Sequence, residues 1–408
     1  MRIAIVCFDY AISVGSLSTS LPCMLADAGH TVDIFLDEPS YSYCASNFNH
    51  SGVTTNVLPS PAKKVKSNLL LTFLAKCSER FLRFFSLKIR YKIIFPEKES
   101  IISMLKNKIV QSAPDIIITY EIRSLASLFW NITIPVVYIN FELLDWNEGT
   151  WAFHYKYLLK TIEKDMLPKL AKVYVTSPLR AQIFVRINNC PDTMVHPLPV
   201  VPQGLEQAQS NNYFRKKFNL SQDIKIVLHA GHIVPWTLLH EIIPTVSQWP
   251  EKTVFVIHTW DKQKVPTDYL EQLITLANGL PVFFSFESIP KNDVCSAWAS
   301  ADIGIAFYQS IDDNFTEILF SSNKFGEYMK AGLPVICSNH PSLKEFVDRH
   351  GIGKAISTTG CATSVIDICN KYDEYAAAVK QCHQQYFVLE RYVKTFMEDI
   401  KNIVDKRK

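Results

Sequence analysis

Short apolar runs alternate with longer stretches of helical periodicity along the whole sequence. Apolar residues at consecutive positions, as in Ile116–Ile118, are typical of strands buried on both faces of a parallel sheet. Leu17, Leu21 and Leu25 recur every fourth residue, which predicts a helix over 17–28. The strands predicted for the first half are Arg2–Cys7, Thr31–Leu36, Val53–Leu58, Asp115–Thr119, Ile134–Asn140 and Lys172–Thr176.

A proline-rich segment near the middle of the chain predicts a linker. Residues 197–204 contain three prolines and end in glycine, a composition typical of boundaries between elements. The alternation then restarts, with helices predicted over Trp236–Trp249 and Pro290–Ser300. The strands predicted for the second half are Ile224–Ala230, Thr253–His258, Pro281–Phe284, Asp302–Phe307 and Pro334–Ser338.

Two successive series of strands and helices predict the α/β fold class, with two Rossmann-like, doubly wound domains facing a cleft. The predicted boundaries are 1–200 for the N-terminal domain, 205–371 for the C-terminal domain and 372–408 for a helical tail. We expect the tail helices to cross back over both domains, because they follow the last predicted strand. Ligands of such sheets bind beyond the carboxyl ends of the strands.

Composition and charge narrow the class of protein. The chain has 408 residues, 48% of them hydrophobic and 20% charged, which excludes wholesale disorder. A net charge of +3 is too small to indicate a nucleic-acid partner. The ten cysteines are scattered and none forms a C-x2-C pair, so we expect no zinc knuckle and a reducing compartment. We expect a cytoplasmic protein, because neither a signal peptide nor a membrane span is recognisable.

The segment 321–336 carries most of the chemical information. Ser321 or Ser322 is predicted to cap a helix, whose free N–H groups form a site for phosphate. Lys324 adds a positive charge there, and Glu327, one turn later, has the chemistry to accept hydrogen bonds from ribose hydroxyls. By themselves, these residues also fit an ordinary helix with a solvated lysine and glutamate.

The sequence of this segment from Ser322 resembles the signature S-x-K-x-x-E-Y-M-A-x-G-x-P-V-I of GT-B glycosyltransferases of the retaining, family-4-like group. The similarity extends back through 299–305 and forward through 341–346 and 351–353. The resemblance implies a nucleotide-sugar donor as substrate, no separate cofactor, and an acceptor on the N-terminal side. The donor-binding residues that it implies here are Ser322, Asn323, Lys324 and Glu327.

Two weaker matches add candidate donor-binding residues. Gly15 and Ser16, between the first strand and a helix, resemble the family's glycine-rich loop that faces the sugar and phosphates. Gly231 and His232 resemble its G-R segment, with histidine in place of the arginine that grips the diphosphate. An ordinary turn and a strand-end histidine without a ligand are the alternative interpretations.

The candidate catalytic residues depart further from the family's pattern. Glu142 matches the acidic position of an H-E-L segment, but Phe141 stands where the family often has histidine. Asp145 or His154 could take the place of the missing histidine. The alternative interpretation of Glu142 is a buried acid that caps a helix. This segment therefore leaves histidine-assisted chemistry in doubt.

The family's Glu-x7-Glu motif is incomplete in this chain. Glu327 matches its second member, but the first falls at Leu319, which has no acid function. Glu317, Asp312 and Asp313 lie on the same predicted loop, and Glu317 is our candidate for the missing acid. Because the two aspartates are adjacent instead of spaced as Asp-x-Asp, we expect a metal-independent reaction with no metal site.

Residues 63–92 form a basic and apolar stretch. They contain nine Lys or Arg residues and a single acid, interleaved with leucine and phenylalanine. This pattern indicates an anionic membrane surface as partner, and hence a peripheral location and a lipid-linked acceptor. A helix pair with a solvated basic face, or a face for a soluble anionic glycan, is the alternative.

The sequence thus predicts a glycosyltransferase of polysaccharide biosynthesis that acts on a glycan or lipid-linked acceptor. Two other functions fit a protein that binds a nucleotide sugar on this fold. One is a sugar-nucleotide epimerase, which needs no acceptor. The other is a non-catalytic nucleotide-sugar-binding protein, suggested by the residues at Leu319, Phe141 and His232.

Overall fold

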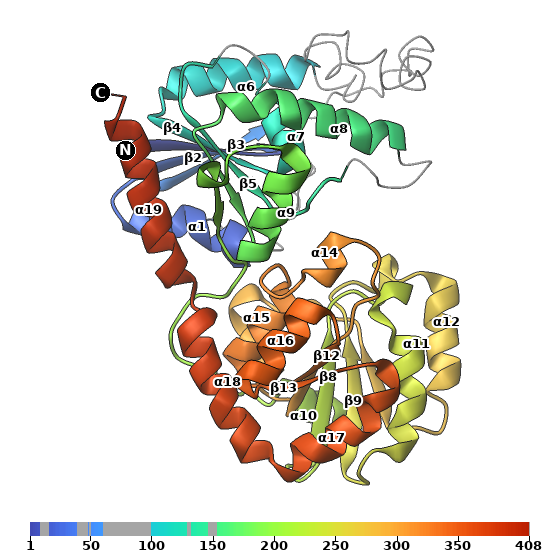
Figure 1. Cartoon of the computed structure of the whole chain (residues 1–408). Helices are drawn as coiled ribbons and strands as arrows, with labels where there is room; N and C mark the ends of the chain where they lie inside the picture. The colour runs from blue at the N-terminus through green and yellow to red at the C-terminus, as the bar shows by residue number, and fades with distance from the viewer. Residues whose placement is uncertain are drawn as a thin grey trace. The chain divides into compact units, whose positions relative to one another are not determined.

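A computed structural model describes residues 1–8, 16–38, 48, 50–59, 99–128, 132–145 and 153–407 (Figure 1). The predictions made for Gly15 and for 63–92 lie outside these residues, as does the side chain of His154. The chain forms two compact units, Met1–Pro199 with Glu390–Lys408, and Val200–Leu389.

The first unit is built on a seven-stranded sheet whose neighbouring strands all pair in parallel. The strand order is β3-β2-β1-β4-β5-β6-β7, so the direction of winding changes between β1 and β4. The strands are β1 (Arg2–Cys7), β2 (Thr31–Asp37), β3 (Val53–Leu58), β4 (Ile116–Tyr120), β5 (Val136–Asn140), β6 (Lys172–Val175) and β7 (Val195–Pro197). The sequence analysis missed β7, because a three-residue strand that contains histidine and proline has little apolar signal.

Helices pack on both faces of this sheet. Tyr138 of β5 contacts Phe184 of α9, with ring centroids 6.4 Å apart. Tyr174 of β6 pairs with the next residue of β5 and therefore points to the other face, where its ring lies 4.8 Å from that of Phe396 in α19. The helices of this unit are α1 (Ser16–Asp27), α6 (Glu99–Ser112), α7 (Glu121–Ala126), α8 (Phe153–Met166), α9 (Pro178–Asn188) and α19 (Leu389–Asp405).

The second unit contains a six-stranded parallel sheet in the order β10-β9-β8-β11-β12-β13. Its winding changes direction between β8 and β11. The strands are β8 (Lys225–Ala230), β9 (Thr253–His258), β10 (Val282–Ser285), β11 (Ile303–Ala306), β12 (Val335–Ser338) and β13 (Gly353–Ile356). The helices are α10 (Tyr213–Phe218), α11 (Leu239–Ile242), α12 (Thr267–Leu276), α13 (Val294–Trp298), α14 (Asp313–Thr316), α15 (Asn323–Ala331), α16 (Pro341–His350), α17 (Cys361–Asn370) and α18 (Tyr372–Tyr386).

Two helical predictions differ from the structure. The helix predicted over Trp236–Trp249 is broken into short 3₁₀ turns on either side of α11, because Pro244 cannot continue an α-helix. The predicted tail 372–408 is divided between the units, since α18 packs on α15 and α16 whereas α19 belongs to the first unit. The last helix of the chain, α19, therefore belongs to the first unit, while α18 packs within the second.

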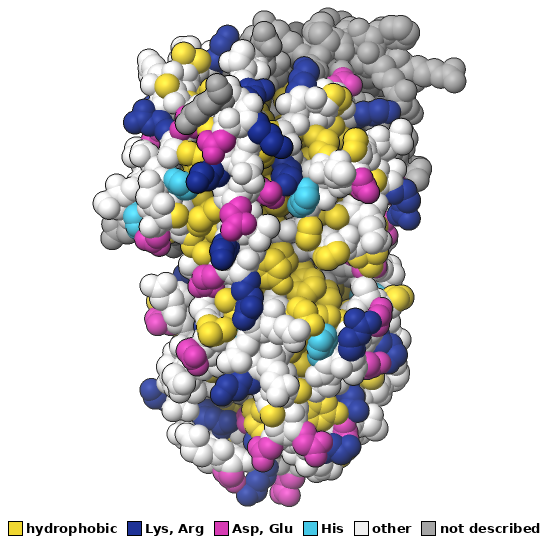
Figure 2. Space-filling model, turned by 60° about the vertical axis from the view of Figure 1, so that its left-hand side comes forward, with side chains coloured by type: hydrophobic (Ala, Val, Ile, Leu, Met, Phe, Trp, Pro, Cys, Tyr) yellow, Lys and Arg dark blue, Asp and Glu magenta, His cyan; other side chains and the backbone are white. Residues whose placement is uncertain are grey.

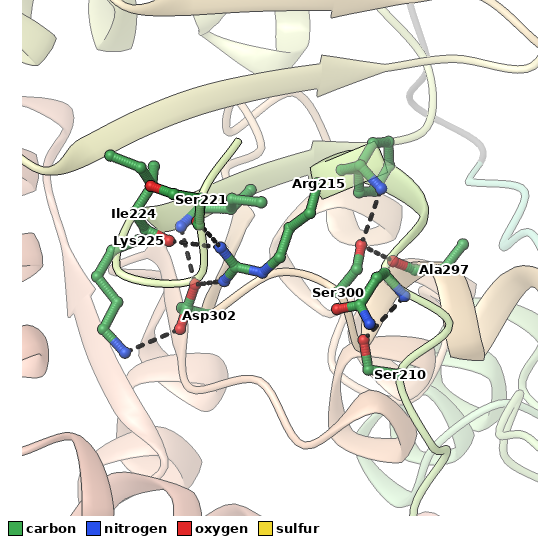
Figure 3. A network of polar contacts seen from close by, with 11 residues as sticks. Ser210, Arg215, Ser221, Ile224, Lys225, Ala297, Ser300 and Asp302 are labelled. Carbon is green, nitrogen blue, oxygen red and sulfur yellow. Dashed lines mark hydrogen bonds and ion pairs between the residues drawn. The ribbon is translucent and has the colours of Figure 1, made fainter. Parts of the chain in front are cut away.

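A polar network holds α10 to the sheet of the second unit (Figure 3). The Asp302 carboxylate, just before β11, accepts hydrogen bonds at 3.0 Å from Arg215 and Lys225. The same carboxylate accepts the backbone N–H of Ile226 at 2.9 Å. Asp302 lies at the amino end of β11, so this network supports the fold at the end of the sheet opposite to where ligands bind.

Positive and negative side chains are interspersed over the described surface seen in Figure 2. This mixture agrees with the small net charge of +3. None of the described helices combines the length and the apolar character that crossing a membrane requires.

Candidate functional site

The two central strands of the second sheet separate at their carboxyl ends, and Tyr328 of α15 fills the gap. Strands β8 and β11 pair for two residues only, so the later backbone groups need other partners. The Tyr328 hydroxyl oxygen lies 3.0 Å from the Leu228 carbonyl and 3.3 Å from that of Ile305, and accepts the Ala230 N–H at 2.9 Å. Its ring fits because Gly304 has no side chain, since a Cβ there would lie 2.4 Å from the ring. Tyr328 thus fixes α15 at the point where the winding reverses.

The N-terminus of α15 lies beside the carboxyl end of β11. Of the two serines predicted as caps, Ser322 is the one that caps, and its Oγ accepts the Phe325 N–H at 3.3 Å. The same oxygen shares a 2.6 Å hydrogen bond with the hydroxyl of Tyr308, which follows β11. Asn323 is the first residue of the helix and is half-buried. Free N–H groups and the positive end of the helix dipole therefore point to this edge of the sheet.

Lys324 lies between the ends of β8 and β11. Its Nζ is 5.4 Å from the centroid of the Tyr308 ring. Its Cε lies against Gly231, where a Cβ would be 3.1 Å away, and the φ of +133° at this residue is one that glycine accepts. Burial lowers the pKa of Lys324 to about 7, although the charge of Glu327 acts in the opposite direction. An anion bound here would restore the full charge of the ammonium group.

His232 follows Gly231 and lies among aromatic rings. Its ring centroid is 4.7 Å from that of Trp260 and 6.1 Å from that of Trp236. Loss of water around the imidazole, and then the positive charge of Lys324, lower the pKa of His232. A lowered pKa favours the neutral ring, which has one N–H to donate, in contrast to the two of a charged histidine.

Glu327 lies one turn after Lys324 and is held by a tryptophan. Its Oε2 accepts the indole N–H of Trp298 at 3.0 Å, and its other oxygen has no hydrogen-bond partner among the described residues. Trp298 is itself stacked on Phe214, with the two rings 3° from parallel. Burial raises the pKa of Glu327 to about 7. One carboxyl oxygen is thus fixed, and the other is available to a ligand.

The structure therefore brings most predicted donor-binding residues to one edge of the second sheet. They are Gly231, His232, Ser322, Asn323, Lys324 and Glu327. Sequence reasoning missed Tyr308 and Trp298, which position Lys324 and Glu327. Tyr308 comes directly after a predicted strand, so its place at a strand's carboxyl end was a signal that could have identified it.

The acidic candidates near α14 have different surroundings. Asp312 caps this helix, since its Oδ1 accepts the N–H groups of Asn314 at 2.8 Å and Phe315 at 3.3 Å. Glu317 ends the helix and is half-buried, whereas Leu319 is buried with 9% exposure. Helix α14 contacts the site through Phe315, whose ring lies 5.3 Å from that of Trp236. Among the described residues, no group of three or more His, Cys, Asp or Glu could hold a metal ion.

The remaining candidates belong to the first unit. Ser16 is the first residue of α1, and Glu142 is exposed just beyond β5. The backbone N–H of Glu142 donates a 3.1 Å hydrogen bond to the carboxylate of Glu121. Sequence reasoning did not identify Glu121, which follows β4 and has a left-handed backbone conformation with φ of +64°.

The chain is similar to solved structures over its whole length, but with low sequence identity. Sucrose-phosphate synthase from Thermosynechococcus elongatus has a TM-score of 0.71 at 16% identity and covers 100% of both chains. Anabaena HepE in complex with UDP-glucose has a TM-score of 0.65 at 13% identity, covering 98% of this chain and 99% of HepE. The UDP-GlcNAc 2-epimerase from Neisseria meningitidis, bound to UDP-GlcNAc, has a TM-score of 0.61 at 12% identity and covers 98% of this chain and 100% of the epimerase. The sequence matches no protein-family model and no curated protein.

These similarities confirm the expected fold class. The chain has two Rossmann-like α/β units with parallel sheets, the architecture of the GT-B glycosyltransferases. At such low identity the similarity concerns the fold, and the retaining, family-4-like character stays a prediction from the sequence motif.

Proposed function

We propose that this protein is a glycosyltransferase that binds a UDP-sugar at the carboxyl edge of the second sheet. The observation that carries the proposal is the position of Lys324, held between Gly231 and Tyr308 beside the N-terminus of α15. A half-buried ammonium group and free helix N–H groups together suit a diphosphate. Two of the similar structures contain a bound UDP-sugar, UDP-glucose in HepE and UDP-GlcNAc in the epimerase, which supports the choice of donor.

In the proposed reaction, an acceptor hydroxyl oxygen bonds to the anomeric carbon as the bond from that carbon to the diphosphate breaks. The acceptor loses a proton, and the departing UDP takes the negative charge. Lys324 and the N–H groups of α15 stabilise that charge without a metal ion. From the sequence resemblance we also propose that the reaction retains the configuration of the anomeric carbon. The same resemblance is the basis for proposing Glu317 and Glu142 as catalytic residues.

The acceptor is proposed to be a glycan or a lipid-linked sugar. The lipid-linked form, the anionic membrane and the peripheral location are proposed from the composition of residues 63–92. Binding to anionic vesicles that weakens as salt increases would support this part of the proposal. The cytoplasmic location is proposed from the scattered cysteines.

A sugar-nucleotide epimerase is the second candidate, favoured by the similarity to the Neisseria epimerase. An epimerase converts its nucleotide sugar without an acceptor. Product analysis after incubation with UDP-GlcNAc alone tests the epimerase: an epimerised nucleotide sugar supports it, and an unchanged donor contradicts it.

We expect UDP to stabilise the protein in the presence of EDTA. A ligand at about 100 times its dissociation constant adds roughly 2.7 kcal/mol to the free energy of unfolding. Thermal unfolding with UDP, UDP-glucose and UDP-GlcNAc measures this effect, and UMP, which lacks the second phosphate, is the control. If none of these nucleotides shifts the transition, the proposed function is wrong. A shift that appears only after magnesium or manganese is added would contradict metal independence alone.

We expect Glu327→Gln to weaken UDP binding by about tenfold or more, because a hydrogen bond to a charged group contributes roughly 1.5–3 kcal/mol. The effect should be specific to the ribose, so calorimetry with pyrophosphate should show unchanged affinity. Glu345→Gln, at an exposed ion pair on α16, is the matched control and should bind UDP like the wild type. Equal losses for UDP and pyrophosphate would place Glu327 elsewhere than at the ribose.

A further inference from the structure

Glu121 has a backbone conformation that glutamate rarely adopts. Its φ is +64°, in the left-handed region, where only glycine and to some extent asparagine are free of strain. Glu121 directly follows the carboxyl end of β4. Strand β4 is one of the two strands, with β1, between which the winding of the sheet changes direction. Ligands of parallel sheets bind outside such switch points, and local strain is concentrated at functional sites.

The Glu121 carboxyl group is fixed by backbone groups of the neighbouring strand connection. Its Oε1 accepts the N–H of Phe141 at 2.6 Å and that of Glu142 at 3.1 Å, just beyond the end of β5. Its Oε2 has no hydrogen-bond partner among the described residues, and the side chain is only half-buried. One oxygen is therefore immobilised while the other is presented at the edge of the sheet.

The surroundings of this carboxyl group favour a neutral ligand. Of the acidic groups that act on it most, Glu163 is paired with Lys160 at 2.6 Å, whereas the exposed Glu142 would repel a phosphate or carboxylate. Burial, followed by the charge of Glu142, raises the pKa of Glu121 to about 8. A carboxyl group that keeps its proton at pH 7 can both donate to and accept from a hydroxyl group.

We propose that Glu121 Oε2 binds a hydroxyl group of an uncharged, polyhydroxylated substrate at the carboxyl end of β4. Within the proposed function, on which this identification rests, that substrate is the acceptor sugar. The strained turn places the carboxyl group where the N–H groups after β5 can orient it, so the binding oxygen needs no reorganisation when the sugar arrives. Glu121 would thus be a specificity-determining residue of the first unit.

Saturation-transfer NMR on the full chain, with glucose, galactose, mannose and N-acetylglucosamine as probes, tests this site. We expect at least one of these sugars to bind the wild type, and Glu121→Ala to weaken that binding at least tenfold. Glu121→Gln should stay within about threefold at pH 7, because its oxygen can accept the N–H groups of Phe141 and Glu142 while its NH2 group still donates to a sugar hydroxyl. Ala113→Gly, which relieves a left-handed φ of +44° away from this edge, is the control and should bind like the wild type.

A second variant covers the case in which Glu121→Ala does not fold. Glu121→Asn tolerates the left-handed conformation but has a shorter side chain, so it should fold and still lose the sugar. The proposal is overturned if none of the four sugars binds the wild type, or if Glu121→Ala and Glu121→Asn retain the affinity. UDP calorimetry on the same samples separates the two hypotheses: sugar binding through Glu121 without UDP binding would refute the glycosyltransferase and leave this site intact.

Discussion

Lys324→Met is expected to lower the affinity for UDP by about ten- to a hundredfold, since a hydrogen-bonded charge on the diphosphate contributes roughly 1.5–3 kcal/mol. Methionine keeps the length of the stem against Gly231 and Tyr308 and removes only the ammonium group. The fold should keep its stability, because a half-buried lysine with a lowered pKa loses little when it is replaced by an apolar side chain.

The pH dependence provides a second readout of the same change. Free Lys324 releases its proton near pH 7, whereas bound diphosphate favours the charged form, so UDP binding takes up a proton above this pH. Wild-type affinity should therefore fall by up to about tenfold per pH unit as pH rises above 7, and the Lys324→Met variant should lack this Lys324-dependent fall.

Isothermal calorimetry across this pH range is the measurement, with Lys344→Met as the matched control. Lys344 lies on α16, is half-exposed, and pairs with Asp348, so its loss should leave UDP binding unchanged. Equal affinity of wild type and Lys324→Met at pH 7 would remove Lys324 from the phosphate site.

Tyr328→Phe is expected to destabilise the second unit by about 3 kcal/mol, because it removes one hydroxyl and leaves buried backbone groups unpaired. The Ala230 N–H donates to this hydroxyl, and the hydroxyl's single proton lies within reach of the Leu228 and Ile305 carbonyls where β8 and β11 separate. Phenylalanine keeps the ring over Gly304, so the expected loss of stability comes from the missing hydrogen bonds and not from changed packing.

Urea unfolding gives the loss of stability, and hydrogen exchange of β8 amides locates it. Tyr213→Phe is the matched control, since the Tyr213 hydroxyl has an exposed partner, Glu287, at 3.0 Å. We expect the control to cost less than about 1 kcal/mol, because exposed groups exchange one partner for water. If both variants lose the same small amount, water has replaced the hydroxyl and Tyr328 does not hold the strands together.

The sequence predicted the elements whose signal is local. Strands such as β1 and β9 were identified with their observed ends, because a run of apolar residues marks a buried strand. The cap at Ser322 and the end of α15 at Gly332, with φ of +78°, also depend on residues that are close together in the sequence. From these local signals the fold class and the phosphate-binding helix could be predicted.

Other features were decided only by tertiary structure, because they join residues far apart in the chain. The contact of Gly231 with Lys324 depends on the strand order, which places the ends of β8 and β11 side by side. The pKa values of Lys324 and Glu327 depend on how much water the surrounding fold removes.

The first unit shows the same division between local and long-range information. Sequence analysis selected Glu142 because it matched a motif, whereas the structure exposes its side chain and places Glu121 in the strained position beside it. No sequence pattern marks a left-handed glutamate, since that conformation is imposed by the hydrogen bonds it makes across to the end of β5. The sequence by itself thus determined the strands other than the short β7 and β13, the cap of α15 and the class of fold, while the pairing of the strands determined which acidic and basic side chains lie close together.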